Sequence, residues 1–327
     1  MIIYKILLKI TYIKNFIIRI LLKIYFFYKN QLIFLNLKNY INDKSNKNIK
    51  KPIFLLGTAS GGLTIVSRII RRHPNIISAS GNSLYFYGQD EINQYYKRFI
   101  PRKLNIFRFQ NFTPQYNAFY SLNKFLKHSV IEKKKFKSYS SKYVMLLNAI
   151  LKVFSKDSDN DRLIDKSQNN TLNIEFIDYA LKGCSPHYIL IVSNPYAIIG
   201  KNFIKLGRHE KKNLIYAIEN YKNLINKCLK DFKKTKNKNL VLNFDDFLNK
   251  PEKVIKKIYN FLDLKFDKNF MPKESDLYKM KLTDYKWFPI RKNTHSKYIN
   301  KLSQKEIKLI NKECSDIIKK LNFKLNN

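Results

Sequence analysis

The sequence is poor in cysteine and in acidic residues, and each shortage excludes a class of protein. Its three cysteines, Cys184, Cys228 and Cys314, lie far apart and include no Cys-x-x-Cys pair. This spacing argues against a disulfide framework and against a zinc site, so we expect no metal and a reducing compartment, the cytoplasm. Asp and Glu together number 24 against 63 Lys and Arg, which gives the 327 residues a formal net charge of +39.

A net charge of this size favours an anionic partner, such as a nucleic acid or a membrane surface. The lysines form no single cluster, however, and no zinc-finger, helix-turn-helix or RNA-binding signature is present, so we expect no nucleic-acid partner. Lys, Asn and Ile are used throughout in place of Arg, Gln and Leu, as in proteins of AT-rich genomes. The charge therefore has a compositional explanation beside a functional one, although either way it steers anionic ligands toward the protein.

The chain also lacks an uninterrupted apolar stretch of about 20 residues, the length that spans a bilayer as a helix. Basic residues interrupt its mostly apolar start; Lys5, Lys9, Arg19 and Lys23 fall on one stripe of a helix, and Lys14 does not. The pattern predicts a basic amphipathic helix attached peripherally to an anionic membrane. A helix packed on the rest of the chain, or an unusual leader, is the alternative. A signal peptide is disfavoured because no small-residue cleavage site follows.

A polar stretch rich in Lys and Asn, residues 38–51, is typical of a linker. We therefore divide the chain into an N-terminal segment, residues 1–50, and one domain, residues 51–327. With 45% hydrophobic residues and no internal repeat, the sequence is long enough to bury a full core.

Alternating apolar and amphipathic stretches predict the elements of this domain. Buried strands are predicted at residues 53–56, 76–79, 162–165, 187–192 and 240–244. Helices are predicted at residues 65–74, 171–181, 196–206 and 211–233, after Pro251, and after the capping box of Ser303 and Glu306. Residues 84–160 are expected to be mostly helical with loops. Strands that alternate with helices indicate an α/β fold with a central parallel sheet flanked by helices.

The first predicted strand runs into a turn of small residues, Gly57 to Thr64, and then into a helix. Backbone N–H groups of such a turn and the positive end of the helix form a cradle for a phosphate group. The turn lacks the Gly-Lys-Ser/Thr ending of nucleotide triphosphatases, so we do not expect the phosphate to be that of ATP. Because ligands of parallel sheets bind beyond the carboxyl ends of the strands, the turn should share one rim with residues 165–167 and 193–195.

Five segments in this order carry a resemblance to a known family. They are Gly57-Thr58-Ala59-Ser60-Gly61-Gly62-Leu63-Thr64, His73-Pro74, Asp165-Lys166-Ser167, Val192-Ser193-Asn194-Pro195, and the stretch from Asn243-Phe244-Asp245-Asp246 through Pro251-Glu252 to Phe261-Leu262-Asp263-Leu264. The chain resembles, over about residues 50–325, the sulfotransferases that use 3′-phosphoadenosine 5′-phosphosulfate (PAPS). Their corresponding patterns are G-x-P-R-S-G-T-T, H-P, E-K-T/S-P, V-R-N-P and Y-E-D-L…D-P-E…F-L-G-L.

The resemblance implies a P-loop-like sulfotransferase fold and transfer of a sulfuryl group from PAPS, the nucleotide co-substrate, to an acceptor hydroxyl. A carbohydrate or a glycolipid is the expected acceptor, and no metal is required. The residues implied in donor binding are Gly57, Ser60, Gly61, Gly62, Leu63, Thr64, Ser193, Lys201, Arg291 and Lys292. Lys166 is the residue implied to stabilise charge on the leaving oxygen. Asp165 is either a base or a partner of Lys166 and of the backbone.

Three positions depart from the family pattern. Ser60 stands where the loop has Arg or Lys, Ser193 stands where an Arg precedes Asn-Pro, and Lys201 replaces a serine. Each missing Arg removes a charge-assisted contact to a phosphate, which Lys201 and the basic C-terminal segment are interpreted as replacing. Asn82 and Ser83 lie where many relatives have a Glu, so no general base is assigned.

Three alternatives therefore remain beside the enzyme. The first is a catalytically inactive protein of the same fold that acts as a binding or scaffold protein. The second is a kinase-like phosphotransferase, and the third is a basic interaction protein associated with a membrane or a nucleic acid.

Overall fold

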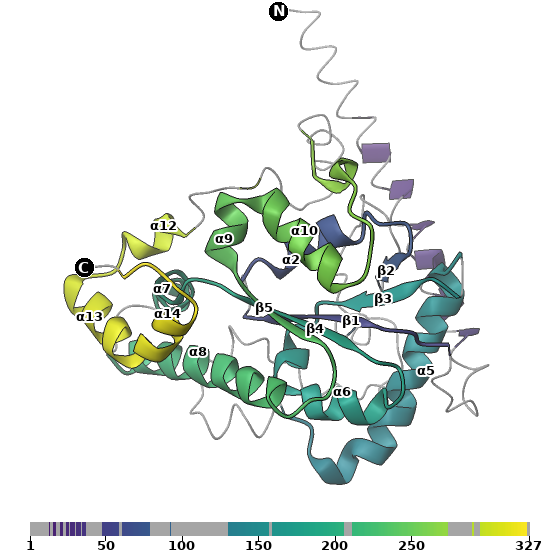
Figure 1. Cartoon of the computed structure of the whole chain (residues 1–327), viewed down its shortest axis with the longest axis horizontal. Coiled ribbons are helices and arrows are strands. Elements are labelled where there is room, and N and C mark those ends of the chain that lie inside the picture. Colours follow the sequence, from purple (N-terminus) through teal and green to yellow (C-terminus); the bar gives the residue numbers. More distant parts are fainter. Residues whose placement is uncertain are drawn as a thin grey trace, which may run out of the picture.

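The computed structural model describes residues 48–58, 61–78, 92, 130–156, 159–205, 211–273, 290 and 295–325, together with separate positions between 13 and 36. Its centre is a parallel sheet with the strand order β2-β3-β1-β4-β5 (Figure 1). The strands are β1 (Ile53–Gly57), β2 (Ile76–Ser78), β3 (Arg162–Asp165), β4 (His187–Val192) and β5 (Asn239–Asn243). The predicted α/β fold with a central parallel sheet is confirmed.

The two central strands are apolar along their whole length because both of their faces are covered. Every residue of β1 and of β4 is buried. The strands pair in parallel from Ile53 opposite His187 to Gly57 opposite Ile191. Continuous apolar runs of this kind are typical of parallel strands between two helical layers. The edge strand β5 is more exposed.

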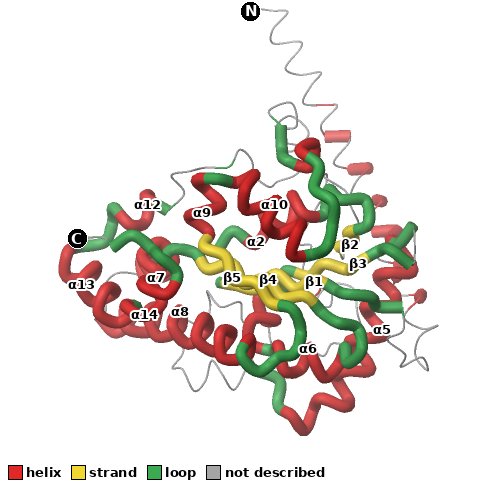
Figure 2. The backbone as a smooth tube through the Cα atoms, in the orientation of Figure 1, coloured by secondary structure: helices red, strands yellow, loops and turns green. Residues whose placement is uncertain are grey.

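Two hydrophobic clusters lie on opposite faces of the sheet, and β1 shows how they are separated. Ile53 and Leu55 belong to one cluster, whereas Phe54 and Leu56 belong to the other. This alternation follows from the two-residue period of a strand. Figure 2 shows the resulting three layers, with helices above and below the strands.

One face is covered by α2 (Leu63–Ile70), α9 (Phe244–Asn249) and α10 (Pro251–Phe261). The opposite face is covered by α5 (Phe136–Phe154), α6 (Ile174–Ala180) and α8 (Lys211–Phe232). The remaining α-helices, α7 (Pro195–Lys205), α12 (Ser296–Ile299), α13 (Gln304–Glu313) and α14 (Ser315–Lys320), gather beside the carboxyl end of β4 (Figure 1). Short 3-10 helices are η3 (Lys133–Lys135), η4 (Gln168–Leu172) and η5 (Lys268–Phe270).

The helix predicted over residues 171–181 is in fact divided between η4 and α6. The break has a local cause, because Asn and Thr side chains there bond to backbone groups in place of a continuous helix ladder. The Asn173 amide donates to the Asn169 carbonyl at 2.7 Å, and the Thr171 hydroxyl donates to the Gly57 carbonyl at 3.2 Å. This break allows η4 to contact the end of β1.

Parts of the predicted organisation lie outside the described residues. They include most of the linker at 38–51 and most of the segment 84–129, whereas α5 accounts for much of residues 130–160 as a helix. The described positions between Ile13 and Asn36 are helical, and Ile33 and Ile49 belong to the hydrophobic core. Among the described residues, no helix has the length and apolar character needed to cross a membrane. The division at residue 50 stays a prediction.

The capping box at the start of α13 provides a stability test. The Ser303 hydroxyl accepts a hydrogen bond from the Glu306 N–H, and the Glu306 carboxylate accepts one from the Ser303 N–H. We expect Ser303→Ala to lower the free energy of unfolding by about 1 kcal/mol, because an N-cap acceptor is lost. Urea unfolding measures the change.

The matched control is Ser140→Ala inside α5. The Ser140 hydroxyl bonds to the Lys137 carbonyl one turn earlier, so it caps no helix. Because alanine is the better helix former, we expect this variant to be neutral or slightly more stable. Equal losses in both variants would contradict the capping role.

Candidate functional site

The loop after β1 has the backbone conformation that its glycines allow. Gly57 has a φ of 151° and Gly62 a φ of 86°, both in the region that favours glycine. A Cβ atom at Gly57 would lie 2.5 Å from the Ile191 carbonyl oxygen, and one at Gly62 would overlap the Phe244 ring. The two glycines therefore let the loop pass directly against β4 and the start of α9.

The N-terminus of α2 lacks the groups that usually satisfy its free N–H groups. Its N-cap residue, Gly62, has no side chain to accept from them, and the first turn contains no acidic residue. The Gly61 N–H donates to the Thr58 carbonyl at 3.0 Å, whereas the buried Thr58 hydroxyl has no hydrogen-bond partner within the described part of the chain. This hydroxyl and the amides of Leu63 and Thr64 form a set of donors at the positive end of the helix.

Lys166 and Asp165 lie at the carboxyl end of β3, the strand beside β1, and both are buried. One carboxylate oxygen of Asp165 accepts from the N–H of Ser167 at 2.9 Å and from its hydroxyl at 2.7 Å. The other oxygen accepts from the Asn170 amide at 2.7 Å. Burial raises the pKa of Asp165, and these hydrogen bonds lower it in part. Asp165 thus holds the turn that carries Lys166.

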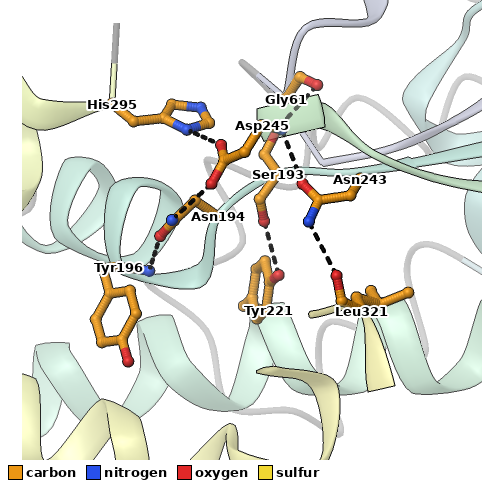
Figure 3. A network of polar contacts seen from close by, with 9 residues as sticks. All are labelled: Gly61, Ser193, Asn194, Tyr196, Tyr221, Asn243, Asp245, His295 and Leu321. Atoms are coloured by element: carbon orange, nitrogen blue, oxygen red, sulfur yellow. Dashed lines mark hydrogen bonds and ion pairs between the residues drawn. The ribbon is translucent and has the colours of Figure 1, made fainter. Parts of the chain in front are cut away.

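Ser193 connects the end of β4 to the loop after β1. Its side chain is fully buried, and its hydroxyl donates to the Gly61 carbonyl at 2.9 Å. The Ser193 carbonyl in turn accepts from the Tyr221 hydroxyl of α8 at 2.8 Å. The serine that stands in place of the family's Arg therefore fastens the loop in this structure (Figure 3). Its assignment to donor binding stays a prediction.

A polar network beside this connection joins three separate segments of the chain (Figure 3). The carboxylate of Asp245, at the start of α9, accepts from the Asn194 amide at 2.9 Å and lies 2.8 Å from Nδ1 of His295. Asn194 also accepts from the Tyr196 N–H at 3.1 Å, which caps α7. Burial opposes ionisation of Asp245, but the hydrogen bonds from His295 and Asn194 and the charge of His295 outweigh it and lower the pKa of this carboxyl.

The sequence analysis did not predict this network, since it assigned no role to Asp245 or to His295. Asp245 belongs to the stretch that matches Y-E-D-L, which was a signal for the carboxylate. No local pattern pairs it with a residue 50 positions away. The Nε2 atom of His295 is buried and has no hydrogen-bond partner among the described residues.

The structure places Lys201 on α7, facing the C-terminal segment. Its Nζ atom lies 5.7 Å from the centre of the Tyr298 ring, and Nζ of Lys297 lies 5.8 Å from the same ring. Gly200 permits this approach, because a Cβ atom there would lie 3.2 Å from the Tyr298 carbonyl. Two lysines thus converge on one aromatic ring near the carboxyl end of β4.

The other predicted donor-binding residues, Ser60, Arg291 and Lys292, lie outside the described residues, as do Asn82 and Ser83. Within the part that is described, no group of three or more His, Cys, Asp or Glu side chains could hold a metal ion.

The three cysteines are free thiols and are buried. Burial raises the pKa of Cys184 to about 11 and that of Cys314 to about 12, and it also raises the pKa of Cys228. The thiols are therefore protonated near neutral pH and are poor nucleophiles.

The network around Asp245 predicts a dependence of stability on pH. Because the pKa of Asp245 is lowered from 3.8 in the folded state, its stabilising effect is complete above pH 3.8 and is lost as the pH falls through the lowered value. We expect Asp245→Asn to be less stable than the wild type by about 2 kcal/mol at pH 7, with a smaller difference below pH 3.8.

Urea unfolding at a series of pH values measures this difference. Asp246→Asn is the matched control, because the neighbouring Asp246 side chain has no hydrogen bond or ion pair within the described residues. A loss in Asp245→Asn that is the same at every pH would argue against ionisation as the cause.

Comparison with known proteins agrees with this arrangement. A family model described as "Sulfotransferase family" matches residues 52–268. The fold is similar to the sulfotransferase domain from the curacin biosynthetic pathway, at 14% identity and a TM-score of 0.53, covering 85% of this chain and 99% of that one. It is also similar to sulfotransferase STF9 from Mycobacterium avium, at 11% identity and a TM-score of 0.53, covering 89% and 82%.

Sulfotransferase STF1 from Mycobacterium tuberculosis H37Rv is similar at 11% identity and a TM-score of 0.51, with 89% of this chain and 84% of that chain covered. At such low identities these structures show the fold alone. A search of curated protein sequences finds no match. The family match covers more than half of the chain and includes the loop after β1, Lys166 and the end of β4. The chain therefore belongs to the sulfotransferase family.

Proposed function

We propose that the chain transfers a sulfuryl group from PAPS to a hydroxyl group of a carbohydrate or a glycolipid. The observation that carries this proposal is the uncapped N-terminus of α2 after β1, together with the buried Lys166 after the neighbouring strand β3. Sulfuryl transfer requires the donor to be held in line with the acceptor and requires charge on the leaving oxygen to be neutralised. Fixed amide donors and a buried cation meet both requirements without a metal.

The residues of the loop fit the 5′ end of such a donor. Within the residues that the structure describes, the Thr58 hydroxyl is buried without a hydrogen-bond partner, and the amides of Leu63 and Thr64 have no capping side chain. Gly62 allows the Phe244 ring to pack directly against the backbone at this end of α2. We assign Thr58, Gly62, Leu63 and Thr64 to the 5′-phosphosulfate and Lys166 to the leaving oxygen. When bound, PAPS supplies the activated sulfuryl group.

A second cationic region lies two strands away from Lys166. Lys166 follows β3, whereas Lys201 lies on the helix after β4, and β1 separates these strands. Neighbouring strands are about 4.8 Å apart, so the ends of β3 and β4 are separated by roughly 10 Å. We assign Lys201 and Lys297 to the 3′-phosphate, together with the predicted Arg291 and Lys292.

These lysines differ from the arginines they would replace. A lysine is a flexible point charge, whereas an arginine binds two phosphate oxygens at once. Tyr298 offsets part of this difference because it restrains Lys201 and Lys297 against one ring. We therefore expect donor binding that is weaker and more dependent on salt than a bidentate arginine site would give.

The alternative is a protein that has kept the fold and lost the activity. Ser193 favours it, because this buried side chain holds the loop and leaves no guanidinium at the end of β4. Asp165 also favours it, since both of its oxygens already accept hydrogen bonds. Such a protein would bind a ligand at the rim without transferring a group.

Titration of the full chain with 3′-phosphoadenosine 5′-phosphate, followed by calorimetry, separates the outcomes. We expect saturable binding with a Kd on the order of micromolar that weakens as the salt concentration rises. Absence of saturable binding at low salt would argue against PAPS as the donor. Inorganic phosphate is the reference for non-specific anion binding.

Transfer of labelled sulfate from PAPS to oligosaccharides and glycolipids tests the activity itself. We expect Lys166→Met to lower the transfer rate by a factor on the order of 100, because a buried cation at the leaving oxygen is lost. Its effect on nucleotide affinity should be smaller. The exposed Lys301→Met is the control and should keep the wild-type rate. Binding without transfer to any acceptor would favour the inactive protein.

We also propose that the N-terminal helix rests on an anionic membrane. Large apolar side chains at its described positions are exposed, among them Phe16 at 56%, Ile20 at 40% and Phe27 at 61%. Together with the basic stripe of the same segment, they have the character of an interfacial helix. A membrane location would bring the rim near a glycolipid acceptor.

Co-sedimentation with vesicles that contain phosphatidylglycerol tests this attachment. We expect the wild type to sediment with them and a Phe16→Ser, Ile20→Ser, Phe27→Ser variant to bind at least about tenfold more weakly, because buried apolar area is lost. Tyr179→Ser, which removes an apolar side chain of 50% exposure on α6, should bind as the wild type does. A wild type that stays in the supernatant would contradict the proposal.

A further inference from the structure

A cavity lies at the amino-terminal ends of the strands, at the edge of the sheet opposite the rim that holds Lys166. Its volume is about 600 Å³. The lining residues come from the start of β1, the start of β3, the turn before β4 and the end of α10. They are Ile49, Lys50, Lys51, Asp159, Asn160, Arg162, Lys182, Gly183, Cys184, Ser185, Leu262, Asp263 and Leu264. This volume falls within the range of small-molecule sites.

Arg162 is the most informative residue of this cavity. It is only 7% exposed, yet its hydrogen bonds go to backbone carbonyls, from Nε to Lys51 at 2.8 Å and from Nη1 to Leu262. Its Nη2 is buried and has no hydrogen-bond partner within the described part of the chain. Burial lowers the pKa of Arg162 to about 10, against the raising effect of Asp263. Buried cations are usually held in an ion pair with a carboxylate.

The charge of Asp263 acts on Arg162, but neither carboxylate of the cavity forms an ion pair with it. Asp159 lies 2.9 Å from Nζ of Lys50, and Asp263 lies 2.8 Å from Nζ of Lys238. Each carboxylate is therefore already paired with a lysine. Lys51 and Lys182 add two further cations to the lining. The cavity thus carries an excess of positive charge around one buried arginine.

The backbone around the cavity is held in an unfavourable conformation. Lys51, Ser185 and Asp263 have φ values of 43°, 53° and 56°, and they are three of the four non-glycine residues with positive φ in the described part. Gly183 has a φ of 87°. Such conformations cost free energy and cluster at ligand-binding sites. Three strained turns therefore meet at the same cavity.

His187 provides a neutral polar neighbour. It is 2% exposed, its Nδ1 lies 3.0 Å from the Ser185 carbonyl, and its Nε2 has no hydrogen-bond partner among the described residues. Burial and the charge of Arg162 lower the pKa of His187 to about 4. The imidazole is therefore neutral near pH 7 and adds no charge to the excess around Arg162.

We infer that this cavity binds a small ligand through a phosphate or sulfate group. The charge of Arg162 attracts this anion from the wall of the cavity, and Lys51 and Lys182 contact the anion at the mouth. The five residues of β1 extend over roughly 16 Å at about 3.3 Å per residue, so this site is separate from the sulfuryl-transfer rim. It does not depend on the proposed transfer activity.

Cys184 permits a test that reports on this cavity alone. It lines the cavity and is 6% exposed, whereas Cys228 and Cys314 are buried elsewhere. The full chain is alkylated with a small maleimide in inorganic phosphate or sulfate, or in chloride of equal ionic strength, and peptide mass spectrometry gives the rate at each cysteine. At an anion concentration of about twice the Kd, we expect alkylation of Cys184 to slow about threefold.

Three variants test whether the protection of Cys184 comes from an anion in this cavity. Lys51→Gln combined with Lys182→Gln should abolish the protection of Cys184 and leave the fold intact, because both lysines are exposed. Lys166→Met, at the opposite rim, should keep the protection. Arg162→Gln is informative only where circular dichroism shows that it folds, and it should then also lose the protection.

The inference would be overturned by either of two results. Cys184 is alkylated at the same rate in phosphate, sulfate and chloride, or the double lysine variant keeps full protection.

Discussion

The close passage of the loop after β1 against β4 and α9 is the constraint on which the rest of the site depends. Gly57 and Gly62 make it sterically possible, and the Ser193 hydroxyl fastens it through the Gly61 carbonyl. Because the loop is held there, α2 starts at the crevice between β1 and β4, from which the chain departs in opposite directions along the sheet. That crevice is where open parallel sheets bind their ligands. The N-terminus of α2 lies at this crevice, and the buried Lys166 follows β3 on the other side of β1.

The positively charged side chains of this protein are either exposed to solvent or buried. Most lysines in the described part of the chain are exposed, and their number fits the general preference of the sequence for Lys over Arg. Lys166 and Arg162 are instead buried at opposite ends of the same strand, β3. A buried cation is unfavourable unless something pairs with it, so these positions carry more information than the net charge does. Lys166 lies at the rim where we propose that the donor binds. Arg162 lies at the opposite ends of the strands, where the resemblance to the family assigns no role.

The departures from the family pattern are structural as well as electrostatic. Replacing the Arg before Asn-Pro by Ser193 removes a cation and adds a short hydrogen-bonding side chain that closes the gap to the loop. The neighbouring Asn194 joins Asp245 and His295, which anchors the C-terminal segment beside α7. That anchoring brings Lys297 to the ring that Lys201 also contacts. The rim has thus been rebuilt from residues that are distant in sequence, and an active transferase and an inactive binding protein would both retain this scaffold.

The sequence by itself determined the elements whose cause is local. Apolar runs identified β1 and β4, the small-residue turn identified the start of α2, and Ser303 with Glu306 identified the start of α13. Only the tertiary structure decided which side chains meet. The pairing of Asp245 with His295, the structural use of Ser193 and the cavity around Arg162 each join segments far apart in the chain. Periodicity and capping act over a few residues, whereas these contacts follow from the strand order, which brings distant strand ends to a common edge.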